Sequence, residues 1–451
     1  MPSVAGLRNV LLDSKPVTDS SWMEDLLGLY EVLDEYSLQH LVDLIQSELD
    51  FVTSKEYYVD PVISEGSIYY RRCLQALRYL STKYRILPSS MIMQDVVREH
   101  LPVSGGGFAD IYRGMLGNQQ ACLKVLRLVI EPDKRMREKI HRHFCSEAVL
   151  WKQLKHPNIL PLFGVNLELF EPSFCLISPW MENGNVITYL KQNHSHNRHK
   201  VLQDIAAGLC YLHSRNPPIT HGDIRGANIL VSNDLRCCLA DFGLALCTAN
   251  SQSGSTAVTS ITMNGAIRWM APELFHHDGS VDVALDHPSR DIYAFGCTII
   301  EILTLEYPFH DLKTDYAVVA SLMSGKRPSR PQSHWCTDTL WYLTTRCWTQ
   351  DRSARPTAYE IYASVQLEGS VQNNKVQPSS SVRRSLTLNP DSLVRNNGTS
   401  WDDSSPETNS GAGVIFWSSR NKQFVWFTDR SSPSRLPQTN SHHYQSKHCA
   451  Q

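Results

Sequence analysis

Three polar side chains near the middle of the chain have the types and the order that a phosphoryl-transfer site needs. Asp223 and Asn228 lie in HGDIRGANIL, and Asp241 opens the DFG tripeptide that follows. A carboxylate can orient an attacking hydroxyl, while an amide and a second carboxylate can hold a metal ion against nucleotide phosphates. Apolar residues flank these groups, and buried charges persist only with partners or a ligand. The stretch therefore predicts a reaction site.

A lysine and a glutamate upstream supply two further charges. Lys124 interrupts the apolar strand pattern ACLKVL, and a buried ammonium requires a carboxylate or phosphate oxygens nearby. Glu147 is the candidate partner, because it lies in FCSEAVLWKQL, a segment whose apolar residues recur at helical spacing. We expect this helix to swing back and place Glu147 beside Lys124.

Short strands with a glycine-rich turn must position Lys124, and a helix must position Asp223. The segment 104–114, SGGGFADIYRG, predicts a hairpin, and 119–130 predicts a third strand. Glycines in such a turn let backbone N–H groups approach phosphate oxygens, although a GGG turn alone is usually only a turn. The segment 202–214 predicts a helix that delivers the chain to Asp223, with apolar residues at helical spacing.

The composition narrows the class of protein. The 451 residues allow two or three domains, and 42% hydrophobic residues supply at least one sizeable core. A net charge of −2 gives no electrostatic footprint for nucleic acid or an anionic membrane, so we expect neither as a partner. No window is apolar enough to span a bilayer and no signal peptide is apparent, which predicts a soluble, cytoplasmic protein. The cysteines lack the paired spacing of a zinc site and predict buried thiols.

The pattern divides the chain into three parts. Residues 1–91 predict a helical N-terminal extension with Ser37 as one helix cap, 92–368 the reaction domain, and 369–451 a Ser/Asn-rich, mostly disordered tail. The extension is either a regulatory or partner-binding module or a set of helices packed on the next domain, and the pattern favours packing. The apolar island 414–427 in the tail could form a hairpin or dock a partner.

With several independent motifs in order, the run from Leu101 to Leu367 resembles the eukaryotic protein kinase domain. Within that family, the sequence of this run is most similar in character to the tyrosine-kinase-like group as expanded in mushroom-forming fungi. The resemblance implies an α+β, bilobal fold with a small β-rich N-lobe and a larger helical C-lobe. It also implies ATP and Mg²⁺ as cofactors and a protein as the substrate.

The resemblance assigns a role to each matching charged position. Asp223 would accept the proton of the substrate hydroxyl, and Arg225, at a position that Lys usually holds, would neutralise the transferred phosphate. Lys124, held by Glu147, would pair with the α- and β-phosphates. The expected Mg²⁺ ligands are Asn228 and Asp241.

The resemblance also implies an ATP-binding surface and two structural contacts. The residues expected around ATP are Ser104, Gly105, Gly106, Gly107, Phe108, Ala109, Ile111, Cys122, Lys124, Ser178, Pro179, Met181 and Leu230. Cys122 and Leu230 would enclose the adenine, Ser178 would be the gatekeeper, and 179–181 the hinge. Outside that surface, Glu273 would pair with Arg355, and Asp291 would bind backbone N–H groups of the catalytic loop.

Several positions depart from the kinase pattern. Ser104, Gly106 and Ala109 occupy the three glycine positions, which implies a weakened or retuned nucleotide grip. Gly222 stands where most family members have an Arg that captures an activation-loop phosphate. We therefore expect activity that does not depend on phosphorylation of the activation loop. Ala266 replaces a Thr that helps mark Ser/Thr specificity.

These residues are compatible with three functions. The leading one is an ATP- and Mg-dependent protein kinase that acts on Ser or Thr in signalling, because five reacting groups are retained. The second is a pseudokinase scaffold that binds nucleotide or partners through the N-terminal helices or the 414–427 island. A third is a tyrosine or dual-specificity kinase, since residues 267–269 look more like those of tyrosine kinases.

Overall fold

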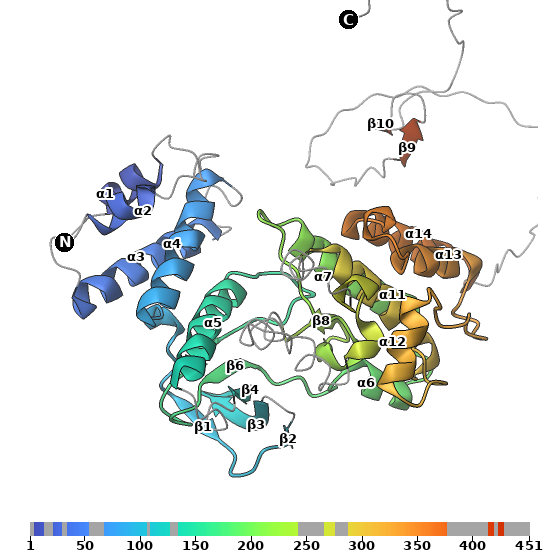
Figure 1. The fold of residues 1–451 in the computed structure, drawn as a ribbon, viewed down its shortest axis with the longest axis horizontal. Coiled ribbons are helices and arrows are strands. Elements are labelled where there is room, and N and C mark those ends of the chain that lie inside the picture. The colour runs from blue at the N-terminus through green and yellow to red at the C-terminus, as the bar shows by residue number, and fades with distance from the viewer. Residues whose placement is uncertain are drawn as a thin grey trace, which may run out of the picture. The chain divides into compact units, whose positions relative to one another are not determined.

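The structure, a computed structural model, describes residues 4–12, 21–28, 34–53, 67–105, 109–126, 134–241, 266–275, 287–376, 414–418 and 423–427. Two compact units divide the chain, Met1–Ser379 and Ser380–Gln451. Figure 1 shows the elements in chain order. The predicted glycine positions 106–107 and Phe108 lie outside the described residues, as does most of the expected tail.

Helices form the N-terminal region, as predicted. Their bounds are α1 Val4–Leu11, α2 Ser21–Leu27, α3 Glu35–Thr53 and α4 Ile68–Tyr84. The apolar stripes of α3 and α4 are buried because the two helices pack on each other. The prediction that Ser37 caps α3 was wrong: Oδ1 of Asp34 accepts the Ser37 N–H at 2.8 Å, so the chain turns into the helix earlier.

An antiparallel sheet forms the N-lobe, in the order β1-β3-β4-β6-β5 with β2 paired to β3. Its strands are β1 Val96–Arg98, β2 Ser104–Gly105, β3 Ala109–Leu116, β4 Gln119–Leu126, β5 Gly164–Asn166 and β6 Cys175–Pro179. The short 3₁₀ helix η1, Ser89–Met91, precedes them, and α5, Lys134–Lys152, packs against β5. Gly117, at φ +57°, makes the tight turn from β3 to β4. The predicted hairpin and third strand are confirmed.

The C-lobe is mainly helical. Its elements are α6 Val186–Gln192, α7 Arg198–His213, η3 Gly226–Asn228, β7 Ile229–Val231, β8 Cys237–Leu239, η4 Ile267–Trp269, η5 Pro272–Phe275, α11 Ser289–Thr304, α12 Asp315–Met323, α13 Asp338–Cys347, η6 Arg352–Ala354 and α14 Ala358–Val376. Almost every residue of α11 is buried, so this helix is the centre around which the lobe packs. A sheet-rich lobe and a helical lobe give the bilobal α+β fold that the sequence predicts.

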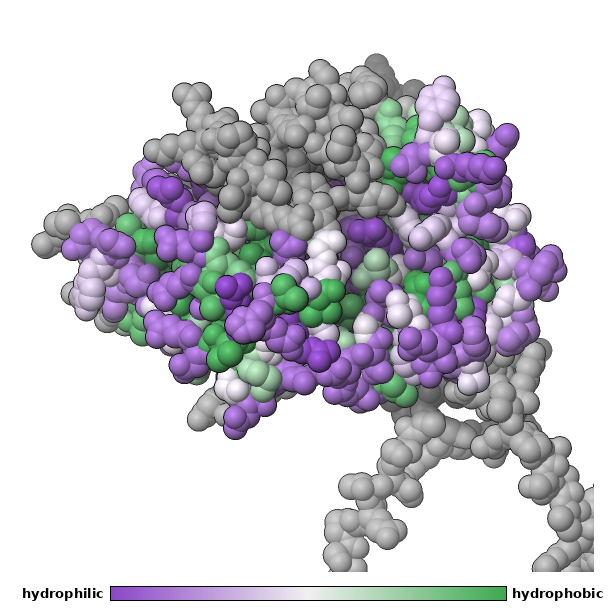
Figure 2. Space-filling model, turned by 90° about the horizontal axis from the view of Figure 1, so that it is seen from below, coloured by the Kyte–Doolittle hydropathy of each residue, from purple (hydrophilic) through white to green (hydrophobic). Residues whose placement is uncertain are grey.

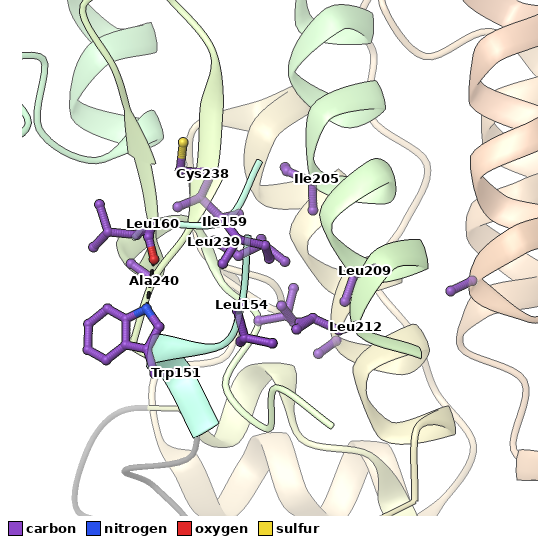
Figure 3. Packing of buried hydrophobic residues seen from close by; sticks show 14 of the residues in the cluster. Trp151, Leu154, Ile159, Leu160, Ile205, Leu209, Leu212, Cys238, Leu239 and Ala240 are labelled. Carbon is purple, nitrogen blue, oxygen red and sulfur yellow. Dashed lines mark hydrogen bonds between the residues drawn. The ribbon is translucent and has the colours of Figure 1, made fainter. Parts of the chain in front are cut away.

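The core beneath the expected site joins three segments that are distant in sequence. Figure 3 shows apolar side chains of the turn after α5, of α7 and of β8 packed together, including Leu154, Leu209 and Leu239. The indole N–H of Trp151 donates to the carbonyl of Leu160 at 2.7 Å and fixes the turn after α5. Leu160 in turn donates its N–H to the carbonyl of Leu239 at 2.9 Å. This core therefore sets the position of β8, which leads into Asp241.

In the second unit, β9, Val414–Ser418, and β10, Gln423–Phe427, pair antiparallel, so the apolar island forms the hairpin that was one of its two predicted states.

Among the described helices, each is too short or too polar to cross a bilayer. The cysteines of the described part are free thiols, mostly buried. Figure 2 shows one face of the molecule, on which hydrophobic side chains lie in small groups among hydrophilic ones.

Candidate active site

A two-stranded hairpin brings the predicted metal ligands to one end. Ile229 of β7 pairs with Leu239 of β8, so the residue before β7 and the residues after β8 leave the hairpin side by side. Those residues are Asn228 and Asp241. The N–H of Ala240 donates to the carbonyl of Asn228 at 2.9 Å and fixes their separation. Backbone hydrogen bonds of the hairpin thus bring two residues together that are separated in the sequence.

Asp223 lies against the same hairpin end. The side-chain amide of Asn228 donates to Oδ2 of Asp223 at 2.7 Å and to its carbonyl at 2.9 Å. Nε of Arg225 lies 3.1 Å from Oδ1 of the same carboxylate. Asn228 is 5% exposed, whereas the side chains of Asp223 and Arg225 are 17% and 22% exposed. The buried amide therefore orients a carboxylate that solvent can reach.

Lys124 completes this cluster of charges from the N-lobe. Its Nζ lies 2.6 Å from Oδ1 of Asp241. Burial alone would raise the pKa of Asp241, but the Lys124 ammonium holds it below its usual range, so the carboxylate stays ionised. Lys124 thus forms an ion pair with Asp241. Glu147 lies half-buried in α5, and its pairing with Lys124 stays a prediction.

Helix α11 holds the loop that carries Asp223. The Asp291 carboxylate accepts the N–H groups of His221 at 2.7 Å and Gly222 at 2.8 Å, as predicted, and contacts Nε2 of His213 at 3.0 Å. Burial would raise the pKa of Asp291, but the hydrogen bond from His213 holds it below its usual range. A permanent charge thus anchors the start of the loop.

Glu301 of α11, which sequence reasoning missed, anchors the rest of the loop. Its Oε2 accepts the N–H of Gly226 at 2.8 Å and the indole N–H of Trp269 at 3.0 Å. One turn earlier, the Thr298 hydroxyl donates to the carbonyl of Ala294 in its own helix at 2.8 Å and lies 3.3 Å from the carbonyl of Ile224. Thr298 lies on the helix face of Asp291, seven residues further on, and Glu301 follows three residues later. The available signal was two polar residues at this spacing within an otherwise apolar helix.

The predicted ATP-side residues of the N-lobe share neighbouring strands. Lys124 lies opposite Ile111 of β3, and Cys122 lies opposite Ser178 of β6. Pro179 ends β6, while Ser104 and Gly105 form β2 at the exposed edge. Ala109 begins β3, Met181 follows β6, and Leu230 lies in β7. Ile111, Cys122, Met181 and Leu230 are half-buried, and their contact with ATP stays a prediction.

The oxygen groups here fit Mg²⁺. Both hydrogens of an amide lie on its nitrogen, so Asn228, whose Nδ2 binds Asp223, keeps its side-chain oxygen as an acceptor. Asp241 adds an ionised carboxylate. Magnesium prefers hard oxygen ligands and is usually held by one or two protein groups together with substrate phosphates. The donor set meets that requirement.

Residues 97–365 match the sequence profile of the family described as protein tyrosine and serine/threonine kinase, over more than half of the chain. The chain belongs to this family. Its relatives include the serine/threonine-protein kinase STY46 of Arabidopsis thaliana, 29% identical over 58% of this chain and 43% of the relative. Another is the serine/threonine/tyrosine-protein kinase HT1 of the same plant, 29% identical over 58% of this chain and 63% of the relative.

A third relative, the dual specificity protein kinase splA of Dictyostelium discoideum, is 27% identical over 57% of this chain and 11% of the relative. The kinase spans less than two thirds of the length of these curated relatives. The similarity therefore concerns the catalytic domain, which the profile match places between β1 and α14.

The segment 266–275 is tied to the C-lobe of this kinase. Arg355 donates to both carboxylate oxygens of Glu273, each at 2.7 Å, which confirms the predicted ion pair. Arg268 donates to the carbonyls of Phe309 and Leu312. Its guanidinium is therefore occupied by backbone groups. Ala266, the other position of interest, is buried.

Proposed function

We propose that this kinase transfers the γ-phosphate of ATP to a protein hydroxyl, with Ser or Thr as the preferred acceptor, in a signalling pathway. The observation that carries the proposal is the convergence of Asp223, Asn228 and Asp241 at one end of the β7–β8 hairpin, with Lys124 2.6 Å from Asp241. These two carboxylates, one amide and one ammonium are the kinds of group that hold metal ions and nucleotide phosphates in phosphoryl-transfer sites.

Each side chain has a part in this proposal. Asp223, oriented by Asn228, would hold the substrate hydroxyl by hydrogen bonding and take its proton at a carboxylate oxygen. Arg225 would balance charge on the transferred group, and Lys124, supported by Glu147, would fix the α- and β-phosphates. Mg²⁺, when bound by Asn228 and Asp241, would neutralise charge on the phosphate oxygens.

The acceptor residue is the finer part of the proposal. A preference for Ser or Thr agrees with the printed name of STY46. The names of HT1 and splA include tyrosine or dual specificity, and residues 267–269 point the same way. We therefore keep a tyrosine or dual-specificity kinase as a variant of the same reaction.

A pseudokinase scaffold is the second candidate function, and specific residues favour it. Ser104 and Ala109 replace two loop glycines, Gly222 replaces an arginine, and Ala266 replaces a threonine. These positions assist nucleotide grip, activation and substrate docking. The five groups that act on phosphate or hydroxyl are retained, and this is why we place phosphotransfer first.

One experiment tests the proposal. The full chain is incubated with labelled ATP, Mg²⁺ and a generic protein substrate, beside Asp223→Asn and Asp241→Asn variants. We expect label transfer by the wild type and a loss of at least about a hundredfold in both variants. Equal signal from all three proteins would reject phosphotransfer and leave the scaffold. Phosphoamino-acid analysis of the product then separates Ser and Thr from Tyr.

The sequence supports further proposals about the group, location, partners and domain boundaries of the kinase. We propose a cytoplasmic member of the tyrosine-kinase-like group from a mushroom-forming fungus, with protein substrates and without nucleic-acid or membrane partners. We also propose domain boundaries at residues 1–91, 92–368 and 369–451. Gly222 supports activity that does not require phosphorylation of the activation loop.

A further inference from the structure

The N-terminal helices lie directly against the helix that carries Glu147. Helix α4 packs along α5, and α3 packs on α4, within the single unit that also contains both lobes of the kinase. Figure 1 shows α4 beside α5 and α3 beyond it. Helix α5 is therefore covered on a side that the catalytic domain alone would leave to solvent.

The buried face of α5 is wide. Phe144 and Ala148 are 1% exposed and lie four residues apart on the helix. Cys145 and Val149 are 0% exposed and are rotated by about 100° from that first pair around the helix. Helix α5 contacts both strand β5 and helix α4. The N-terminal helices therefore take part in the packing of α5 together with the sheet.

Polar contacts fix α5 against the N-terminal helices at two points. Nε of Arg78 in α4 donates to the Ser146 hydroxyl at 3.1 Å. Just beyond the end of α5, Nε2 of Gln153 donates to Oε1 of Gln46 in α3 at 2.9 Å, and these side chains are 3% and 1% exposed. Separating this pair is costly, because the buried Oε1 of Gln46 would lose its donor.

We propose that α3 and α4 position α5 for phosphotransfer, with Arg78 as a positioning residue for Glu147; this inference rests on the proposed function. Ser146 directly precedes Glu147, so a bond that fixes Ser146 also fixes the rotation of α5 about its axis. The contact between Gln46 and Gln153 fixes the helix end. Together they restrict both rotation and outward movement of α5. The N-terminal extension is thus a built-in activator of the kinase.

The test uses the full chain with Arg78→Ala, Ser146→Ala and the double variant. Gln75→Ala is the matched control, because Gln75 is exposed on the same helix one turn away. We expect Arg78→Ala to lower kcat by about tenfold and to raise KM for ATP, because Glu147, to which we assign the support of Lys124, would be displaced. Ser146→Ala should have a similar effect, the double variant should be no worse than either single one, and Arg78→Lys should recover part of the activity.

Hydrogen exchange supplies a readout that does not depend on activity. Amides of α5 should exchange faster in Arg78→Ala than in the wild type, while those of α11 stay unchanged. Activity and α5 exchange equal to those of Gln75→Ala would overturn the proposal, and so would faster exchange throughout the molecule. If the wild type proves inactive, the exchange result and the affinity for Mg-ATP still decide the positioning role, whereas equal signal from Asp223→Asn rejects phosphotransfer separately.

Discussion

Glu301 is the buried acid whose replacement has the most specific expected outcome. Burial raises its pKa from 4.5 to about 7, although the hydrogen bonds from Gly226 and Trp269 act in the opposite direction. A protonated Glu301 buries no charge, so its favourable contribution to folding is complete below about pH 4.5 and is lost as the pH rises through about 7. The difference between these two pKa values means that Glu301 costs about 3 kcal/mol of stability once the pH is above about 7.

Glu301→Gln should remove this loss without removing the contacts. Both hydrogen bonds end on one oxygen, Oε2, and an amide oxygen has two lone pairs with which to accept them. We therefore expect the variant to be more stable than the wild type by about 2–3 kcal/mol near pH 8.5 and about equal to it near pH 5. Glu301→Ala removes the acceptor altogether and should destabilise the kinase at every pH.

The assay is urea unfolding of the full chain at a series of pH values, monitored by tryptophan fluorescence. The quantity of interest is the difference in unfolding free energy between variant and wild type, because other titrating groups cancel in it. Glu306→Gln is the matched control, since Glu306 follows closely in sequence and is exposed. A Glu301→Gln protein whose stability falls with pH as steeply as that of the wild type would refute the reasoning.

Three further outcomes follow from the described contacts. Arg355→Met leaves Glu273 without its partner, so we expect a loss of about 3–5 kcal/mol in urea unfolding, and a loss below about 1 kcal/mol would contradict a buried ion pair. Burial raises the pKa of the Cys122 thiol to about 11, so its alkylation by iodoacetamide at neutral pH should be slow and should accelerate towards pH 11; fast labelling at neutral pH would contradict the burial. Phosphatase treatment should leave the rate of phosphotransfer unchanged, because Gly222 offers no guanidinium to an activation-loop phosphate, and a large decrease in rate would contradict this.

The resemblance to protein kinases predicted two contacts outside the ATP-binding surface, and both are present. They are the Glu273–Arg355 ion pair and the bonds from Asp291 to the loop backbone. The sequence predicted less where several partners compete for one group. Lys124 could pair with either of two carboxylates, and the choice depends on the relative placement of α5 and β8, which no local pattern encodes.

The role of Glu301 was missed for a related reason. Its partners, Gly226 and Trp269, come from two segments that meet only after the C-lobe has packed. Glu301 lies ten residues after Asp291 in α11, and this spacing does not reveal what either side chain contacts. Tertiary packing thus decided the partners of Glu301.

Gly222 shows how the loop can be ordered without a phosphate-binding side chain. Its N–H donates to Asp291 at 2.8 Å, and its carbonyl accepts Nη2 of Arg290 at 2.7 Å. Its φ of +86° lies where a residue with a Cβ is strained and glycine is not. Both backbone groups of this residue are therefore held by the start of α11, which is part of the permanent core. Order at this point of the loop comes from the fold itself, and this is the physical reason to expect a kinase that is active before any phosphate is added.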